Sequence, residues 1–372
     1  MSMWRTRHSR VAAVAALALA GLSLSSAPVA SASSHDAEDG GYLQLNLFSN
    51  QPGRAAVTDP NLVNGWGMSQ GPTTPVWVSD NGADVTTLYT GAGVGKTPAR
   101  VPLVVKIPDG APTGQVFNAT TSFVLSNGLP ARFIFAGEHG SISAWNPTLS
   151  PNTAALPEAS SAGAVFKGMA LLVSPSGPQL LLADFGHGRI AVYDSAFHAV
   201  ATPSWAFTDP KLPKGYEPFN VAVLAGRVYV SYALRDPATL DDVAGRGHGF
   251  VDVYGADGTL LKRLARRGAL NSPWGLAIAP AGFGALSGDL LVGNFGDGRI
   301  HAFDPATGEK EGTLRDPMGK PIVIDGLWGL LPGNGTSADT TDVWFSAGPD
   351  GEANGLVGVL RAAPPKPEGS HS

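Results

Sequence analysis

The sequence contains no cysteine. This excludes disulfide bonds, a thiol nucleophile, cysteine-ligated zinc and iron–sulfur clusters. The fold must therefore be held by burial of apolar side chains, which a chain of 372 residues can achieve. Charged residues are scarce, at 15%, and form no basic cluster suited to a phosphate backbone. We therefore expect no nucleic acid among the partners of this protein.

The first 32 residues have the pattern of a secretory signal peptide. Arg5, Arg7 and Arg10 form a basic start, residues 11–24 are apolar, and Ala30-Ser31-Ala32 is a small-residue cleavage site. The apolar stretch is too short for a comfortable membrane span. We therefore expect a secreted, extracellular protein with no membrane span in its mature form. Loss of the three arginines would change the formal charge from -5 to -8.

A short pattern recurs through the rest of the chain: an aromatic residue, a small or amide residue, and then an apolar strand. Its six occurrences, 50 to 55 residues apart, are Trp66-Gly67, Phe117-Asn118, Lys167-Gly168, Phe219-Asn220, Trp274-Gly275 and Trp328-Gly329. Lys167 stands where the other units have an aromatic residue. A constant period of this length is the signature of a repeat architecture.

Each unit continues with a β-branched or aromatic strand, a glycine-containing turn and an alternating strand. Two units share nearly the same hairpin, at residues 184–190 and 294–300. Each unit is thus about four strands without a helical stretch. Such sheets bury both faces when they pack radially, so the sequence predicts an all-β, six-bladed β-propeller.

The last unit is one strand short after residues 356–360, and the apolar residues 42–47 precede the first unit. We expect this N-terminal strand to close the ring. The predicted organisation is a signal peptide at 1–32, a flexible segment at 33–41, the propeller at 42–362 and a disordered Pro-rich tail at 363–372. We expect a monomer.

Residues 274–277 and 290–300 resemble the NHL type of propeller repeat. Residues 56–64, 249–253 and 271–303 are similar to a family of secreted bacterial proteins of unknown function, and this resemblance runs from about Leu45 to Val359. It implies a propeller fold and export. It implies no established reaction and therefore no catalytic residues.

Ligands of propellers usually bind at the face where the innermost strands begin, which also carries the turns between second and third strands. Candidate ligand-binding residues at this channel mouth are Asn64, Lys167, Glu217, Tyr232, Arg235 and Asn294. The long hairpin at residues 233–249 is the most individual feature of this face, and long loops in compact domains are often binding loops. The alternative is that the polar residues only cap strand ends and turns.

Two sets of residues are candidate metal ligands. Oxygen ligands suited to Ca²⁺ are Asn118, Glu217, Asn220 and Asp325. Imidazoles suited to Zn²⁺ or Cu²⁺ are His139, His187 and His248, each in a glycine-flanked turn. His301 follows its hairpin on a strand, and we expect it to be exposed.

Two classes of function remain. The first is an extracellular binding module that holds a small molecule, a glycan or a protein at the channel mouth. The second is a metal-dependent hydrolase or lyase similar to six-bladed lactonases, with no residue-by-residue motif to support it. The fold alone does not choose between them, because propellers host both. A channel filled by the repeat aromatics would favour the binding module.

Overall fold

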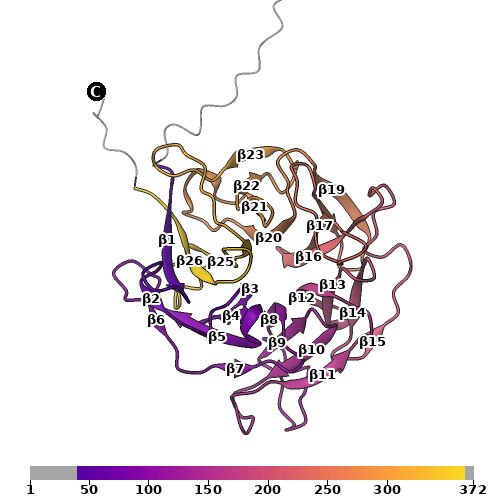
Figure 1. Ribbon diagram of the computed structural model, residues 1–372. Coiled ribbons are helices and arrows are strands. Elements are labelled where there is room, and N and C mark those ends of the chain that lie inside the picture. The colour runs from indigo at the N-terminus through magenta and orange to yellow at the C-terminus, as the bar shows by residue number, and fades with distance from the viewer. Residues whose placement is uncertain (1–39, 365–372) are drawn as a thin grey trace, which may run out of the picture. The chain divides into compact units, whose positions relative to one another are not determined.

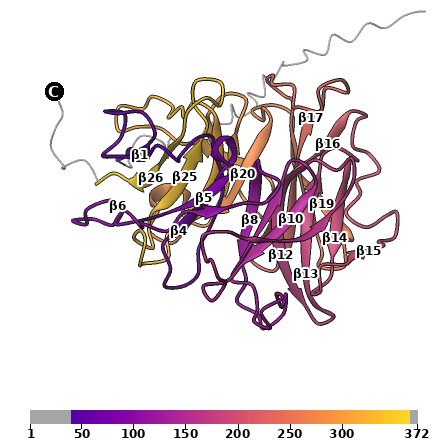
Figure 2. The ribbon, with the colours of Figure 1, turned by 60° about the horizontal axis from the view of Figure 1, so that its bottom comes forward.

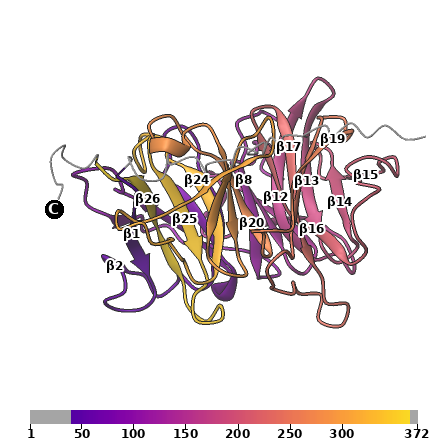
Figure 3. The ribbon, with the colours of Figure 1, turned by 90° about the horizontal axis from the view of Figure 1, so that it is seen from above.

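The computed structural model describes residues 40–364. Within this range the strands form six sheets arranged as blades in a ring, so the chain is a six-bladed β-propeller as predicted (Figure 1). Side views show the blades next to one another, with loops at both ends of the strands (Figures 2 and 3). The predicted signal peptide and residues 365–372 of the predicted tail lie outside the described residues.

Each blade has four main strands. The innermost strands of blades one to six are β3 (Gly65–Ser69), β8 (Pro112–Phe117), β12 (Phe166–Ser174), β16 (Tyr216–Leu224), β20 (Pro273–Ile278) and β24 (Leu327–Pro332). The second strands are β4 (Val76–Asp80), β9 (Phe133–Gly137), β13 (Gly177–Asp184), β17 (Arg227–Leu234), β21 (Leu290–Asn294) and β25 (Val343–Ala347). We call the face where the innermost strands begin the top face and the opposite one the bottom face.

The outer half of each blade is built in the same way. The third strands are β5 (Val85–Thr90), β10 (Ser141–Trp145), β14 (Arg189–Tyr193), β18 (Phe250–Tyr254), β22 (Ile300–Phe303) and β26 (Leu356–Ala362). The outermost strands are β6 (Ala99–Arg100), β11 (Leu156–Ser160), β15 (Ala199–Val200), β19 (Leu260–Arg266), β23 (Lys310–Thr313) and β1 (Tyr42–Ser49). Short additions are β2 (Val57–Thr58), β7 (Val105–Lys106) and the 3₁₀ turns η2 (Asn81–Ala83) and η3 (Gly284–Leu286). No helix in residues 40–364 is long and apolar enough to cross a membrane.

The N-terminal strand closes the ring. Strand β1 pairs antiparallel with β26, from Tyr42 opposite Ala362 to Ser49 opposite Leu356. In Figure 1 the indigo start of the fold therefore lies beside its yellow end. This confirms the predicted closure, in which β1 covers the outer edge of β26.

The Trp-Gly pattern has a steric cause. A Cβ atom added to Gly67 would lie 2.4 Å from the carbonyl oxygen of Thr113, and one added to Gly114 would lie 2.3 Å from the backbone nitrogen of Met169. Neighbouring innermost strands thus approach one another backbone to backbone. Glycine at these two positions permits that approach, because a side chain on Gly67 or Gly114 would collide with the next blade.

In the second blade, the predicted position of the repeat is wrong. Gln115 pairs with Phe135 in the way that Met68 pairs with Val78 in blade one. Thr113-Gly114 therefore takes the place of Trp66-Gly67. Phe117-Asn118, which the pattern indicated, lies at the bottom end of β8. The aromatic residue of that pair misdirected the alignment, because the true position holds threonine.

Asp59-Pro60 and Asp209-Pro210 lie in the connections that lead to the innermost strands of blades one and four, where their aspartates stabilise turns. Asp59 accepts hydrogen bonds from the backbone of Asn61 and from the hydroxyl of Tyr89, and it pairs with Arg100. Asp209 of the fourth unit has a similar environment, with Arg263 as its ion-pair partner. Together with the apolar clusters between the blades, these contacts hold the ring without disulfides.

Candidate functional site

Aromatic side chains fill the middle of the channel. Trp66 stacks on Trp328 with ring centroids 3.7 Å apart, and Phe295 stacks on the same tryptophan at 3.9 Å. Trp274 meets Trp328 edge to face at 5.8 Å. Phe219 completes this group, and all five except Phe295 are buried. We call these five residues the aromatic plug. The channel is therefore closed at its centre. A closed channel is what we expected of a binding module rather than of a metal-dependent enzyme.

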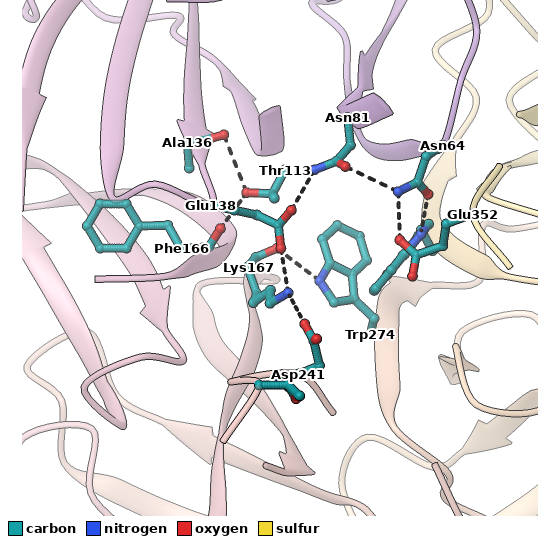
Figure 4. Close-up of polar contacts among 12 residues, drawn as sticks. Asn64, Asn81, Thr113, Ala136, Glu138, Phe166, Lys167, Asp241, Trp274 and Glu352 are labelled. Carbon is teal, nitrogen blue, oxygen red and sulfur yellow. Dashed lines mark hydrogen bonds and ion pairs between the residues drawn. The ribbon is translucent and has the colours of Figure 1, made fainter. Parts of the chain in front are cut away.

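Lys167 lies beside the aromatic plug, at the repeat position that holds a plug aromatic in blades one, four, five and six. Its side chain is only 5% exposed, and its ammonium donates a hydrogen bond to Glu138 Oε1 at 2.5 Å. Asp241 Oδ1 lies 3.6 Å from the same ammonium, and the Trp66 ring centroid lies 5.1 Å from it. Figure 4 shows Lys167 between the two carboxylates. Two carboxylates and the face of an indole ring thus surround the amino group of this buried lysine.

A chain of hydrogen bonds continues from Glu138 around the top mouth. Asn81 donates to Glu138 Oε2 at 3.0 Å, and Asn64 donates both to Asn81 Oδ1 at 3.2 Å and to Glu352 Oε2 at 2.6 Å. The indole of Trp328 donates to Asn64 Oδ1 at 3.0 Å. These contacts join blades one, two and six (Figure 4). The polar network therefore rests directly on the aromatic plug.

Carboxylates outnumber cations at this mouth. Glu138 and Asp241 lie against the amino group of Lys167, and Asp242 and Glu352 are close enough for Lys167 to influence their ionisation. Burial raises the pKa of Glu352, the hydrogen bond from Asn64 opposes this, and the charge of Glu138 adds to it. Burial likewise raises the pKa of Asp242, which Lys167 partly opposes. We call these four carboxylates the mouth carboxylates. An added cation would lower the free energy of their ionised forms.

Glu352 also has an unusual backbone. Its φ is 69°, in the left-handed region that favours glycine. The residue lies in the hairpin between β25 and β26, and its side chain is directed to Asn64 at the mouth. Non-glycine residues held in this region are often found at binding sites.

The long hairpin of blade four lies across the top face, as the sequence predicted. Arg235 donates to the carbonyl oxygens of Phe185 and Gly186 in blade three, at 2.5 and 2.7 Å. On the other side, the backbone nitrogen of Gly245 donates to Asn271 Oδ1 of blade five. Residues 235–249 are thus fastened to both neighbouring blades, and this brings Asp241 to Lys167.

The six predicted ligand-binding residues have different surroundings. Asn64 and Lys167 belong to the mouth network. Asn294 is fully buried and donates to the carbonyl oxygen of Ala269, so it holds the loop before β20. Tyr232 is buried between blades, with its hydroxyl 2.6 Å from that of Tyr254.

Glu217 and Tyr232 line a separate cavity of about 260 Å³ between blades three and four. Arg235, the sixth predicted residue, lies 3.5 Å from Glu217 Oε1. Burial raises the pKa of Glu217, and Arg235 opposes this. The structure therefore divides the predicted set between the channel mouth and this lateral cavity.

The four predicted calcium ligands have separate contacts. Asn118 donates to the carbonyl oxygens of Ser122 and Ala131 in a bottom-face turn. Asn220 donates to the carbonyl oxygen of Trp274 inside the channel, and Asp325 accepts from a backbone nitrogen of the blade-six hairpin. Glu217 lies beside Arg235. Asn118 is on the opposite face from Glu217, so this set does not form one site, and the misaligned second repeat is the reason.

The three candidate histidines are held by hydrogen-bond contacts within the protein. His139 and His248 each contact a backbone carbonyl oxygen through Nδ1, at 2.8 Å in both cases. His187 Nδ1 lies 2.8 Å from Asp184 Oδ2 in the same hairpin. In residues 40–364 no group of three or more His, Asp or Glu side chains has the geometry to hold a metal ion.

His301 is buried, not exposed, because it lies on β22 opposite Thr313 of the outermost strand. Burial lowers its pKa to about 4, and the charge of Lys310 contributes to this. The expectation of an exposed histidine was therefore wrong.

Two further features were not identified from the repeat pattern. Glu352 lies in a hairpin that the repeat does not resemble, and its left-handed backbone has no sequence signature. The stretch from Gly67 to Gly71 matches Gly-x-Ser-x-Gly, the motif of hydrolase nucleophile elbows. Here Ser69 ends an innermost strand, and its hydroxyl donates to Gln115 Oε1 at 3.1 Å. The strand-to-helix turn that such a nucleophile needs is missing at this position.

The blades and the plugged channel define a six-bladed β-propeller protein. Comparison with known proteins then shows the family to which it belongs. The chain is 33% identical over 325 residues to "Uncharacterized protein R648" of Acanthamoeba polyphaga mimivirus, covering 84% of this chain and 78% of the relative. "Uncharacterized protein L690" of the same virus is 33% identical over 328 residues, with 84% of each chain covered. The protein belongs to the family of these two relatives.

No family model matches the chain. Among solved structures, a catalytically inactive virginiamycin B lyase from Staphylococcus aureus with quinupristin is similar, with a TM-score of 0.51 and 12% identity. This match covers 87% of the present chain and 99% of the lyase chain. At this identity the likeness shows the propeller fold alone.

Proposed function

We propose that this protein is a secreted binding module whose top-face channel mouth binds a small molecule through a cationic amine. The observation that supports this most directly is the surplus of mouth carboxylates around Lys167. Lys167 neutralises one of them, so the remaining negative charge is available to an incoming ammonium group. Charge-assisted hydrogen bonds of this kind contribute about 1.5–3 kcal/mol each.

The raised pKa values of Glu352 and Asp242 support the same proposal. Burial disfavours their ionised forms in the free protein, and a bound cation would favour them. Ligand binding is therefore expected to release protons and to be tighter at pH 8 than at pH 5. Because the site is partly exposed, higher ionic strength should weaken binding.

The experiment is isothermal titration calorimetry with spermidine, with CaCl₂ and maltose as comparison ligands. We expect spermidine to bind at pH 7.5, and Glu352→Gln or Asp242→Asn to weaken it about tenfold to a hundredfold. Glu309→Gln is the matched control, because this glutamate is exposed on an outer turn. The melting temperature of each variant establishes that it is folded.

Each comparison ligand represents another class of function. Calcium binding that is lost in Glu352→Gln would assign the mouth carboxylates to a metal site, which the metal-dependent alternative requires. Maltose binding without spermidine binding would assign the mouth to glycans. No spermidine heat with folded wild-type protein, or equal affinity in all variants, would refute the amine proposal.

A further inference from the structure

A second cavity occupies the bottom half of the channel. It lies between the aromatic plug and the bottom face, has a volume of about 300 Å³, and is lined by all six innermost strands. Its apolar walls come from Met68, Met169, Leu276 and Leu330, and Trp274 of the plug lies at its inner end. The cavity is therefore separated by the plug from the charged top mouth.

The lining of this cavity contains no ionisable side chain. Its polar side chains are already bonded within the protein. Gln115 donates to the carbonyl oxygen of Gly67 at 2.9 Å and accepts from Ser69, while Asn220 donates to the carbonyl oxygen of Trp274 at 2.7 Å. A charged group entering here would lose its hydration without gaining a partner of opposite charge. The lining thus selects against ions, in contrast to the top mouth.

The walls of the cavity are preformed. Neighbouring innermost strands touch backbone to backbone at Gly67 and Gly114, so the width of the channel is fixed by main-chain contacts. Trp274 is fixed by two hydrogen bonds, from its indole to the carbonyl oxygen of Lys167 at 3.0 Å and from Asn220 to its own carbonyl oxygen. Met68 and Met169 supply the adaptable part of the wall, because methionine side chains adjust to irregular shapes. A preformed site of this kind binds with little ordering cost.

The size of the cavity limits the occupant. Small-molecule pockets span about 300–1,000 Å³, and an apolar cavity of about 150 Å³ already accepts benzene. A closed inner end and six surrounding strands exclude a folded protein partner. We propose that the bottom-face cavity binds an uncharged, predominantly apolar small molecule of about one or two rings. This is a second site, independent of the proposed amine site.

The test uses prodan, an uncharged dye built on a two-ring naphthalene, whose fluorescence shifts to shorter wavelength in apolar surroundings. We expect saturable binding to the wild-type protein. Met68→Glu and Leu171→Glu place a carboxylate on the wall from blades one and three, and each should weaken binding at least about tenfold. Met318→Glu is the control, because Met318 is 93% exposed on the surface and should leave the affinity unchanged.

The outcomes separate this site from the top mouth. Glu352→Gln, which should abolish most spermidine binding, is expected to leave dye binding unchanged. The proposal would be overturned if the wild-type protein showed no saturable dye binding. It would also be overturned if folded Met68→Glu and Leu171→Glu bound the dye with the affinity of the wild type. A crystal structure of the wild-type complex tests it without any variant. Dye bound outside the six innermost strands would also overturn it.

Discussion

Asp252 in blade four should make the free energy of unfolding of the protein fall as the pH rises, and replacing it with asparagine should remove this dependence. Asp252 lies on β18 and is fully buried. Burial raises its pKa to about 7, and the negative charge of Asp209 contributes, while Arg263 opposes the shift. Arg263 Nε lies 3.7 Å from Asp252 Oδ1, beyond hydrogen-bond distance, because this guanidinium is paired with Asp209.

The sign of the effect follows from proton binding. The folded protein holds the Asp252 proton up to about pH 7, whereas the unfolded chain releases it near the ordinary aspartate pKa of 3.8. The folded state therefore binds more protons between these values, and the free energy of unfolding falls as the pH rises. A shift of about three pKa units corresponds to at most about 4 kcal/mol. Asparagine resembles the protonated carboxyl and cannot ionise.

The assay is urea denaturation followed by tryptophan fluorescence, from pH 4.5 to 8.5. We expect the free energy of unfolding of Asp252→Asn to exceed that of the wild type by only about 1 kcal/mol at pH 4.5 and by up to about 4 kcal/mol at pH 8. Asp257→Asn, in the exposed turn of the same blade, should leave the slope above pH 6 unchanged, because hydrogen bonds within the turn lower the pKa of Asp257. A variant less stable than the wild type at pH 8, or a difference that does not vary with pH, would refute the reasoning.

Three further substitutions test the packing and the buried histidine. Gly67→Ala brings a methyl group against the carbonyl oxygen of Thr113 and should destabilise the protein by about 1–3 kcal/mol in the same assay. Trp328→Ala removes the centre of the plug and should cost about 3–5 kcal/mol, so an unchanged unfolding midpoint would contradict the plug's role. The pKa of His301, lowered to about 4, predicts that wild-type stability falls as the pH drops from 6.5 to 4, by up to about 3 kcal/mol. His301→Gln should remove that part of the fall, and the same acid sensitivity in the variant would assign it to other groups.

The fold was predictable because its steric requirement repeats. Trp66-Gly67, Trp274-Gly275 and Trp328-Gly329 mark innermost strands, since a side chain in place of the glycine would strike the next blade. The closing strand could also be predicted, because the last unit lacked a fourth strand and an unassigned apolar stretch precedes the first unit. The second blade was misaligned because Thr113 replaces the aromatic residue, and a similar aromatic pair lies four residues further on.

The site was predictable only in part. Lys167 was found as a departure from the repeat, and the hairpin of residues 233–249 was found by its length. Their contact through Asp241 depends on how the hairpin folds across the face, which no local pattern specifies. Glu352 reaches the mouth through a left-handed backbone in an irregular hairpin. Side chains that meet across a ring have no fixed spacing in the sequence.

A crystal structure of the protein with saturating spermidine tests the central claim most directly. We expect an ammonium group within hydrogen-bond distance of Glu352 and Asp241 at the top mouth, with the aromatic plug beneath it unchanged. Spermidine bound at another surface, or a top mouth that contains only water at saturating ligand, would contradict the account.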